Sequence, residues 1–425
     1  MTDPLPLAGG EVLRVERLGA DGDGIVSQGD TNLYLPITLP GELVEAGPRY
    51  PRGQGQTADA TIVQASPDRV AAPCRHFGPC GGCTVQHMAD PYYADWKRSL
   101  LADTVRRLGF TGELPPLART PPMARRRMDL AIRRENGAVR IGLHMRRSAS
   151  VVDMQECPVL HPALFALVTA LRPVLRSLSG LKREGSAVVN LLDDGPDLLL
   201  RTDAPLSSSD RSRLAQMAEA LRMPRISWST NGRHDQPEPA CNILPALVSF
   251  SGRSTTVPSG AFLQASKQGE AAIQQAVVAA LPKLRAKARI VELFAGCGSL
   301  THAISDAARV DAYEGDAAAI LSLRAARNPR VSAFHRDLAR QPLQPADLKT
   351  AAAIVLDPPH GGAREQMPAL AGTGVPIIYV TCNPAALLRD GRMLTDVGYR
   401  VSSAVPIDQF LWSARVEGVV AFTKP

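Results

Sequence analysis

The most constraining feature of this 425-residue sequence is a series of short segments rich in apolar residues in its C-terminal third. These segments are RIVELF (residues 289–294), RVDAYE (309–314), AAIVLD (352–357) and VPIIYVT (375–381), and the helix-like stretch QGEAAIQQAVVAALPKLRA precedes them. Apolar strands that alternate with helical or irregular segments are typical of a parallel sheet covered on both faces. The sequence therefore predicts a doubly wound α/β domain that binds ligands at the carboxyl ends of its strands.

A loop of small residues follows the first of these strands. In IVELFAGCGSLT, Gly296 and Gly298 would let the backbone approach a bound ligand closely. They supply only two of the three glycines in the fingerprint of nicotinamide dinucleotide sites. Glu314 ends the next strand, about twenty residues on, where a carboxylate can accept hydrogen bonds from ribose hydroxyls, and Asp337 follows near the position of an adenine. Each feature is ordinary alone, but their order predicts a site for a nucleoside cofactor.

Reactive side chains follow two later strands of the predicted sheet. Asp357 begins DPPHGG, and Cys382 follows VPIIYVT in the motif VTCNP. Both should face the same crevice as the glycine loop. A thiol there is a candidate nucleophile, although a single buried cysteine is more often a packing residue. Glu417, flanked by apolar residues in ARVEGVVAFT, has surroundings that raise a carboxyl pKa and suit the group to proton transfer.

Four of the seven cysteines have the spacing of a metal centre. CRHFGPCGGC places Cys74, Cys80 and Cys83 in a C-x5-C-x2-C pattern, and Cys157 follows after 73 intervening residues. Grouped thiols in a chain without an export signal favour a metal site over disulfides. Four sulfur ligands suit zinc or an iron-sulfur cluster, and the Cys-Pro pair at 157–158 favours [4Fe-4S]. We expect a structural role for this centre, with free thiols as the alternative.

The positive charge of the chain is concentrated in one segment. Residues 97–147 hold 13 of the 48 Lys and Arg residues but only 4 of the 41 Asp and Glu residues, and Arg125, Arg126 and Arg127 form their densest point. Such a pattern is typical of contacts to nucleic-acid phosphates, and equally of a solvated basic face. Aromatic residues make up only 4% of the chain, which argues against a surface that reads many bases by stacking.

The N-terminal part of the chain has an all-β pattern. From residue 9 to 65, short apolar runs such as GIVSQ and TNLYLPI alternate with turn signals, which predicts a five-stranded barrel with GPRYPRGQGQ as a loop. A linker is expected at residues 66–74, and mixed helix and strand patterns extend from 74 to about 258. No uncharged run reaches the roughly 18 residues of a membrane span, and no secretory signal is recognisable. We therefore expect a soluble, cytoplasmic protein without a membrane partner.

Taken together, these motifs resemble the RNA 5-methyluridine (uracil-C5) methyltransferases of the 23S rRNA type, which carry an iron-sulfur cluster and a leading TRAM domain. The marks of the resemblance are CRHFGPCGGC with Cys157, GAFLQAS, VELFAGCGSL, DPPHGG, VTCNP and VEGVV, which extend over essentially the whole chain. The resemblance implies a multidomain architecture. It consists of an OB-like TRAM β-barrel at residues 1–66, a central mixed α/β iron-sulfur and RNA-binding domain at 67–259, and a Rossmann-like class I methyltransferase domain at 260–425.

The resemblance also implies roles for individual residues. Cys382 would be the nucleophile that adds to C6 of uracil, Glu417 would be the base that removes the C5 proton, and Phe262 would stack on the extruded base. The S-adenosylmethionine pocket would be lined by Gln264, Phe294, Ser299, Glu314, Asp337 and Asp357. The [4Fe-4S] cluster would be held by Cys74, Cys80, Cys83 and Cys157, which leaves Cys241 and Cys297 without an assigned role.

Three positions depart from the family pattern. His360 stands where Arg is usual, Ser266 where Asn is common, and Thr381 where Ser is frequent. We expect these differences to affect substrate detail and cofactor affinity more than the reaction type. The partner would be structured RNA, with rRNA favoured over tRNA, bound by a monomer. Two other function classes stay open, namely a non-catalytic iron-sulfur RNA-binding protein and a transferase that acts on a small molecule.

Overall fold

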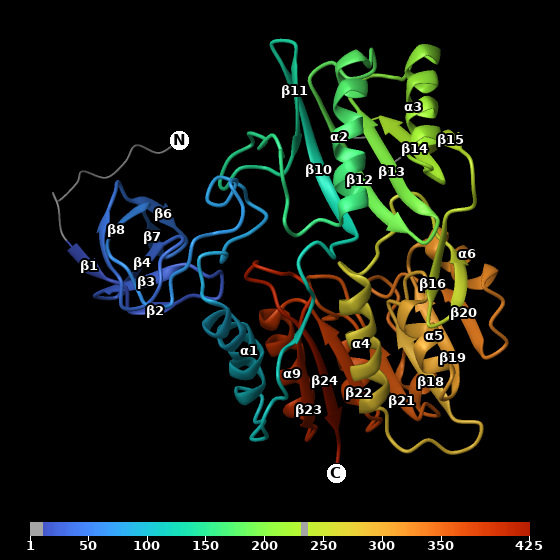
Figure 1. The fold of residues 1–425 in the computed structure, drawn as a ribbon. Helices are drawn as coiled ribbons and strands as arrows, with labels where there is room; N and C mark the ends of the chain where they lie inside the picture. The colour runs from blue at the N-terminus through green and yellow to red at the C-terminus, as the bar shows by residue number, and fades with distance from the viewer. Residues whose placement is uncertain (1–11, 231–236) are drawn as a thin grey trace.

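The computed structural model describes residues 12–230 and 237–425, so residues 1–11 of the predicted barrel domain lie outside the described residues. The chain forms three bodies (Figure 1). A small β unit lies on one side, an α/β body with a six-stranded sheet lies at the top, and a larger α/β body with an eight-stranded sheet lies below it.

Residues 12–64 form eight short strands in two sheets, of orders β1-β5-β8 and β2-β3-β4-β7-β6, in place of the five predicted strands. The side chains of Leu33, Leu35 and Val44 form the core between them. The predicted loop at 47–56 is wrong, because β6 and β7 form a hairpin there. Its Pro51 is tolerated because β6 is an edge strand. The strands are β1 (Val12–Arg14), β2 (Arg17–Leu18), β3 (Gly24–Gln28), β4 (Thr31–Leu35), β5 (Leu43–Ala46), β6 (Tyr50–Arg52), β7 (Gly55–Thr57) and β8 (Ala60–Gln64).

The segment after the cysteine motif packs on the C-terminal body, although it was expected to belong to the central domain. Helix α1 (Asp90–Arg106) contributes Leu101 and Val105 to the same core as Ile354 and Tyr379 of the C-terminal sheet. Strand β9 (Ala118–Arg119) then pairs with the edge of that sheet. Residues 90–119 therefore belong to the C-terminal body, although they precede the central body in the sequence.

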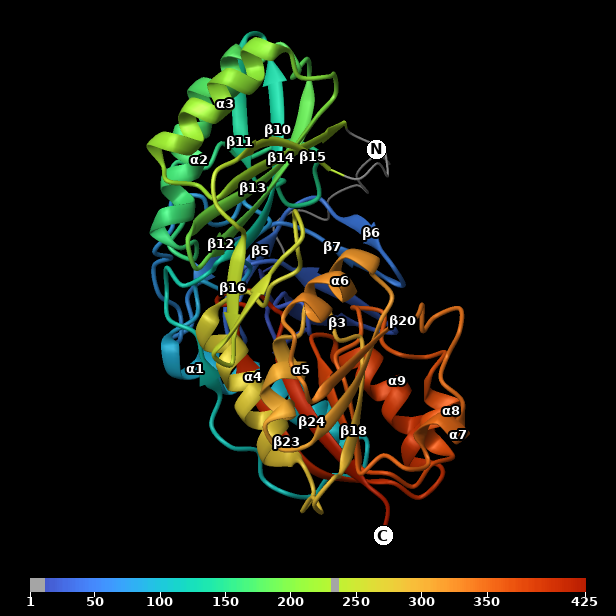
Figure 2. The same cartoon turned by 90° about the vertical axis from the view of Figure 1, so that its right-hand side faces the viewer.

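The central body is a six-stranded sheet of order β11-β10-β12-β13-β14-β15. Helices α2 and α3 cover one face of this sheet (Figure 2). The predicted helix at 163–178 and the strands AVVNLL and DLLLRT are confirmed as α2, β12 and β13. The elements are β10 (Arg127–Glu135), β11 (Ala138–Gly142), α2 (Pro162–Ser177), β12 (Glu184–Leu192), β13 (Gly195–Thr202), α3 (Ser208–Ala220), β14 (Arg225–Thr230) and β15 (Glu238–Asn242).

A hairpin of β16 (Leu247–Phe250) and β17 (Arg253–Thr256) connects the two α/β bodies. Its Val248 and Phe250 pack against Cys297 and Ala319 of the C-terminal body. A loop at 257–266 and helix α4 (Lys267–Ala280) follow, and Ser266 caps this helix by accepting the amide of Gly269 (2.9 Å). A serine therefore performs a local structural task at this position.

The C-terminal sheet has the order β20-β19-β18-β21-β22-β24-β23-β9. Its first five strands are parallel, as predicted, whereas β24 runs antiparallel to both β22 and β23. Helices α1, α8 and α9 pack on one face, and α4, α5 and α6 pack on the other. The elements are β18 (Arg289–Leu293), α5 (Ser299–Ser305), β19 (Arg309–Glu314), α6 (Ala317–Ala325), β20 (Val331–His335), α7 (Pro345–Leu348), β21 (Ala353–Leu356), α8 (Met367–Ala371), β22 (Ile377–Thr381), α9 (Pro384–Thr395), β23 (Arg400–Asp408) and β24 (Glu417–Thr423).

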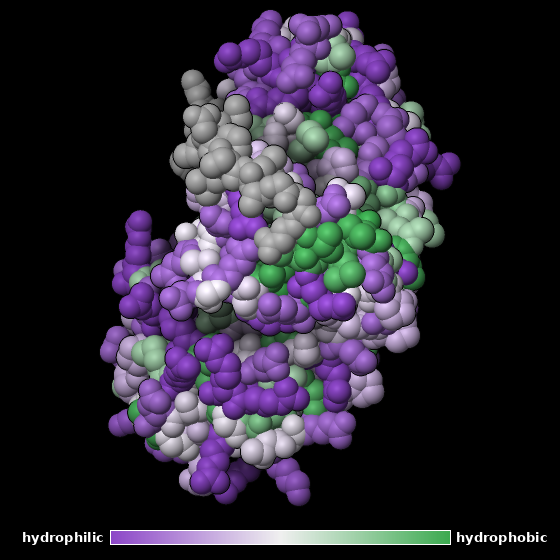
Figure 3. All heavy atoms as spheres, turned by 90° about the vertical axis from the view of Figure 1, so that its left-hand side faces the viewer, coloured by the Kyte–Doolittle hydropathy of each residue, from purple (hydrophilic) through white to green (hydrophobic). Residues whose placement is uncertain are grey.

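Hydrophilic side chains cover most of the face on the side of the small β unit, with one apolar area at mid-height (Figure 3). None of the helices in the described part of the chain combines the length and the hydrophobicity needed to cross a membrane.

Candidate active site

Cys382 occupies a fixed turn between β22 and α9. The hydroxyl of Thr381 accepts the amide of Asn383 (3.0 Å) and donates to the carbonyl of the same residue (3.1 Å). The Asn383 side chain in turn caps α9 by accepting the amide of Ala385 (3.0 Å). These bonds hold the backbone on both sides of the thiol. Thr381 supplies the same hydroxyl chemistry as serine, so this departure from the family pattern leaves the turn intact.

The Cys382 thiol is surrounded by groups that oppose its ionisation. Burial and, as smaller effects, the charges of Glu417 and Asp357 together raise its pKa to about 11, although the charge of Arg415 opposes them. Its Sγ lies 3.7 Å from Nδ1 of His360, which is exposed. The structure therefore brings the predicted nucleophile together with the predicted base and with Asp357.

Two glutamine side chains connect the carboxyl groups of Glu417 and Asp357. Gln409 Nε2 donates to Oε2 of Glu417 (2.6 Å) and to Oε1 of Gln264 (2.7 Å). Gln264 Nε2 donates to Oδ2 of Asp357 (3.1 Å). Sequence reasoning missed Gln409, because a glutamine at the end of a strand carries no pattern that marks it. Only the fold brings the side chain to the base.

The carboxyl groups of Glu417 and Asp357 both have raised pKa values. Burial and, as a smaller effect, the charge of Asp357 raise the pKa of Glu417 to about 8, although the hydrogen bond from Gln409 opposes them. Burial also raises the pKa of Asp357, and the bond from Gln264 lowers it. Such a pair can accept and hold a proton near neutral pH, which is the property that proton transfer requires.

The glycine loop and its acidic neighbours meet as predicted. Phe294, Gly296 and Gly298 all have positive φ angles, of 63°, 55° and 101°. No atom lies within 4 Å of the position that a Cβ on Gly296 would occupy, so the loop leaves open space there. Glu314 accepts the amide of Gly296 (2.8 Å), which ties the loop to the end of β19. Each oxygen of this carboxylate keeps a lone pair for a further donor, such as a ribose hydroxyl.

Asp337 lies beside Glu314, since β20 pairs with β19 and Gly315 approaches the Asp337 backbone closely. Its exposed carboxylate accepts the amide of Ala339 (3.0 Å). The strand ends therefore present Glu314 and Asp337 along one edge, next to the open glycine loop. Their role in binding a nucleoside stays a prediction.

Ser299 is committed to an internal network. Its hydroxyl donates to Oε1 of Glu270 (2.9 Å), which also accepts Nη2 of Arg126 (2.8 Å). Arg126 is only 1% exposed, and its Nε donates to the carbonyl of Gln264 (3.1 Å). The ion pair therefore connects Arg126, at the start of the central body, to helix α4, and the bond from Nε connects it to the loop that carries Gln264.

The basic segment does not form one continuous phosphate-binding face. Arg126 stands at the densest point of positive charge in the sequence, but its side chain is buried in the ion pair with Glu270. Lys97 is likewise buried, and its Nζ donates to Asp408 (2.8 Å) and to the carbonyls of Phe410 and Arg415. The interpretation as RNA contacts is wrong for these two residues, because a buried charge needs an internal partner and each has one.

Phe262 is the most exposed large apolar side chain in the described part of the chain, at 68%. The Arg127 guanidinium lies over its ring, 5.2 Å from the centroid. The ring stands two residues before Gln264 and presents a free aromatic surface with a cation on it. Such a surface suits stacking with a base.

The four cysteines of the predicted metal centre lie close enough to influence one another. The thiols of Cys74, Cys80 and Cys83 have pKa values raised by burial and, as a smaller effect, by Cys157. Burial raises the pKa of Cys157 too, whereas the amides of Val159 and Leu160 donate to its sulfur and lower it. Among the described residues, however, no group of three or more His, Cys, Asp or Glu side chains is placed to hold a metal ion. The thiols thus converge without a formed metal site.

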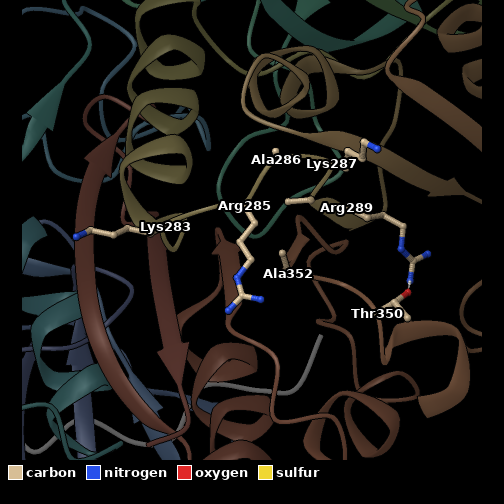
Figure 4. Close-up of a pocket in the computed structure, with 8 residues that line it drawn as sticks. Lys283, Arg285, Ala286, Lys287, Arg289, Thr350 and Ala352 are labelled. Carbon is tan, nitrogen blue, oxygen red and sulfur yellow. Dashed lines mark hydrogen bonds between the residues drawn. The ribbon is translucent and has the colours of Figure 1, made fainter.

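A hollow of about 480 Å³ lies away from these residues, at the amino ends of β18 and β21 (Figure 4). Lys283, Arg285, Lys287 and Arg289 line it, and Arg289 points to the Thr350 hydroxyl (2.8 Å). Cys382 and Asp357 follow the opposite, carboxyl ends of the strands. This hollow is therefore separate from the candidate active site.

The sequence has relatives along its whole length. It is 37% identical to an uncharacterized RNA methyltransferase of Rhizobium meliloti, over 96% of this chain and 98% of that one. It is 34% identical to the 23S rRNA (uracil(1939)-C(5))-methyltransferase RlmD of Halomonas elongata, over 97% of this chain and 89% of that one. The chain belongs to the RNA uracil-C5 methyltransferase family. It is thus an RNA methyltransferase.

Solved structures agree with this membership at the level of the fold. The structure of the Pyrococcus abyssi tRNA (uracil-54, C5)-methyltransferase, in complex with S-adenosyl-L-homocysteine, superposes with a TM-score of 0.74. It is 19% identical in sequence and covers 97% of this chain and 100% of that chain. This family member therefore has the multidomain architecture of that enzyme, including its Rossmann-like methyltransferase fold. No family model matches the chain.

Proposed function

We propose that this protein transfers a methyl group from S-adenosylmethionine to C5 of one uridine in structured RNA, through a covalent bond between Cys382 and C6 of the base. The observation that carries the proposal is the position of Cys382 beside Glu417 at the carboxyl edge of the sheet, where Thr381 of β22 pairs with Gly418 of β24 and the neighbouring parallel strand β21 leads to Asp357. Methylation at C5 requires a nucleophile to activate the ring and a base to remove the C5 proton. The half-buried Cys382 and the buried Glu417 supply these two groups in one cluster.

The residues at the strand ends fit S-adenosylmethionine. The open space over Gly296 admits a ligand against the loop, and the Glu314 carboxylate is held at its rim. Phe294, Asp337 and Asp357 would complete the pocket with Gln264, while Ser299 would support it through Glu270. When bound, S-adenosylmethionine supplies an electrophilic methyl group.

The residues of the chain account for the other steps. The Cys382 thiolate adds to C6 of uracil, which makes C5 nucleophilic towards the methyl group. After C5 is methylated, Glu417 accepts the C5 proton, and the bond between Cys382 and C6 breaks to restore the ring. The target uridine must leave its stack to reach the half-buried thiol, and the exposed ring of Phe262 provides a surface for the extruded base.

The proposal includes a [4Fe-4S] cluster with a structural role, which the four cysteines would hold. Their sulfurs influence one another electrostatically, and backbone amides donate to Cys80 and Cys157. Hydrogen bonds to sulfur are one of the ways in which proteins tune such clusters. The amides of Thr84 and Val85, directly after Cys83, donate to the carbonyl of Trp412 (2.9 and 3.1 Å). A cluster there would brace the loop that leads to Glu417.

We infer a 23S rRNA substrate from the relative in Halomonas elongata, whose name gives that RNA. The TRAM-like β unit and the central body would hold the RNA by its backbone. The test offers S-adenosylmethionine with a labelled methyl group, together with either 23S rRNA or tRNA from cells that lack this gene, and locates 5-methyluridine by mass spectrometry. We expect labelled 5-methyluridine at one rRNA position with the wild type and with Cys241→Ala, a cysteine variant in β15, and none with Cys382→Ala.

If 5-methyluridine formed on tRNA alone, the substrate would be tRNA and not 23S rRNA. No product on either RNA, with RNA still bound, would favour the non-catalytic function.

A further inference from the structure

We propose that Gln409 is a positioning residue for the base: its side-chain amide holds the Glu417 carboxylate in place and joins it to the cofactor side of the site through Gln264. This inference rests on the proposed function and adds a residue to it. Gln409 is 3% exposed, and its side chain makes three hydrogen bonds of 2.6 to 2.9 Å. These bonds use the amide oxygen and both amide hydrogens, so no polar group of this buried side chain is left without a partner.

The orientation of the Gln409 amide is fixed by the backbone. The amide of Ala265 donates to Gln409 Oε1 (2.9 Å), so the NH2 group must point the other way, towards Glu417 and Gln264. Because Gln264 Oε1 accepts one of these hydrogens, its own NH2 group faces Asp357. Each amide therefore offers a donor to one carboxyl group, and a single backbone N–H sets the direction of the whole chain of bonds.

Both ends of this chain are anchored outside the site. On one side, Asp408 accepts bonds from Lys97 (2.8 Å) and from the Tyr93 hydroxyl (2.5 Å), which fixes the backbone next to Gln409. On the other side, Arg126 donates to the carbonyls of Gln264 (3.1 Å) and Ala265 (2.8 Å). The Gln409 amide thus spans two immobilised segments, which is the arrangement expected of a group that keeps a base in position.

The charged and titratable groups around Glu417 make this bond consequential. Asp357 from the end of β21 opposes ionisation of Glu417, and Cys382 lies on the other side of the pair. Gln409 is the hydrogen-bond donor that lowers the pKa of Glu417. Arg415 is the nearby cation, and it acts on Cys382. Without the Gln409 amide, burial and the Asp357 carboxylate would oppose the ionisation of Glu417, and no side-chain hydrogen bond would favour it.

The test compares Gln409→Met, which keeps the length of the side chain but removes both donors, with Gln366→Met. Gln366 is a matched control, since it is also buried (1% exposed) and its side chain bonds to the backbone of Leu343, away from the site. A charge-assisted hydrogen bond is worth about a ten- to hundredfold rate effect and about one to two pH units. For Gln409→Met we expect kcat to fall by this factor with an unchanged KM for RNA, and the acidic limb of the kcat profile to move to higher pH. The Gln366→Met variant should keep the wild-type profile.

A second readout does not depend on activity. The loss of thermal stability in Gln409→Met should grow as pH rises from 5 to 9, because Glu417 then loses its proton without a donor, and this growth should vanish in the Glu417→Gln background. If the methylation assay fails with the wild type, the proposed function fails, and the stability measurement still decides the contact. An unchanged pH profile together with a pH-independent stability loss equal to that of Gln366→Met would overturn the positioning role.

Discussion

The buried ion pair between Arg126 and Glu270 leads to the sharpest prediction about stability. Arg126→Met should destabilise the protein by about 3–5 kcal/mol, because it leaves the Glu270 carboxylate buried without its cation. Arg126 is 1% exposed, its guanidinium lies 2.8 Å from Glu270, and burial already raises the pKa of that carboxyl. The variant should also lose activity, since Arg126 holds the carbonyl of Gln264.

Urea denaturation at pH 7 measures this loss. The double variant Arg126→Met/Glu270→Met should regain a large part of the stability, because no unpaired charge then remains. Arg133→Met serves as a surface control, since Arg133 pairs with the exposed Glu184 and such pairs contribute only about 0–1 kcal/mol. An Arg126→Met variant that is as stable as the wild type, but whose RNA affinity falls with a salt slope reduced by about 0.9, would restore the phosphate-contact interpretation.

Three further predictions concern the site. Between the pKa of Glu417 in the unfolded chain and its value of about 8 in the folded protein, the folded state binds the extra proton, so stability falls as pH rises through this window. In thermal melts, Glu417→Gln should make the melting temperature fall less steeply with pH and should not raise it at pH 5. An unchanged dependence of the melting temperature on pH would contradict a raised pKa for Glu417. Arg415→Ala should slow alkylation of Cys382 by iodoacetamide at pH 8 to 9, because Arg415 lowers the pKa of that thiol. Equal rates in the variant and the wild type would show that the charge of Arg415 does not act on the thiol. Anaerobically purified protein should contain about four irons per chain and a visible brown chromophore, which Cys157→Ser should lose, and a stoichiometric zinc content would replace the iron-sulfur assignment.

Much of the C-terminal sheet could be predicted because burial on both faces marks its strands. AAIVLD contains β21 and VPIIYVT contains β22, and both strands are buried along their whole length. RVDAYE coincides with β19, although buried and partly exposed residues alternate along that strand. Strand β20 was missed because it is half-exposed, and β23 because its first half alternates. The antiparallel placement of β24 depends on contacts far apart in the sequence, which no local pattern reports.

The candidate site shows the same division. Cys382 and Glu417 stand out locally, through a strand end and through an acid among apolar residues, and the fold brings them together. Gln409 carries no local signal, since its task arises from Gln264, which lies 145 positions away. Charge density was misleading for Lys97 and Arg126, because composition does not distinguish a buried ion pair from an exposed cation.

The central claim is that Cys382 forms a covalent bond with C6 of the target uridine. The direct test incubates the protein and S-adenosylmethionine with RNA in which 5-fluorouridine replaces uridine, because fluorine at C5 cannot be removed as a proton by Glu417. We predict a protein–RNA complex that survives denaturing electrophoresis for the wild type and is absent for Cys382→Ala. Peptide mapping should place the RNA on Cys382. A complex of equal yield with Cys382→Ala, or full formation of 5-methyluridine on ordinary RNA by that variant, would contradict the covalent mechanism.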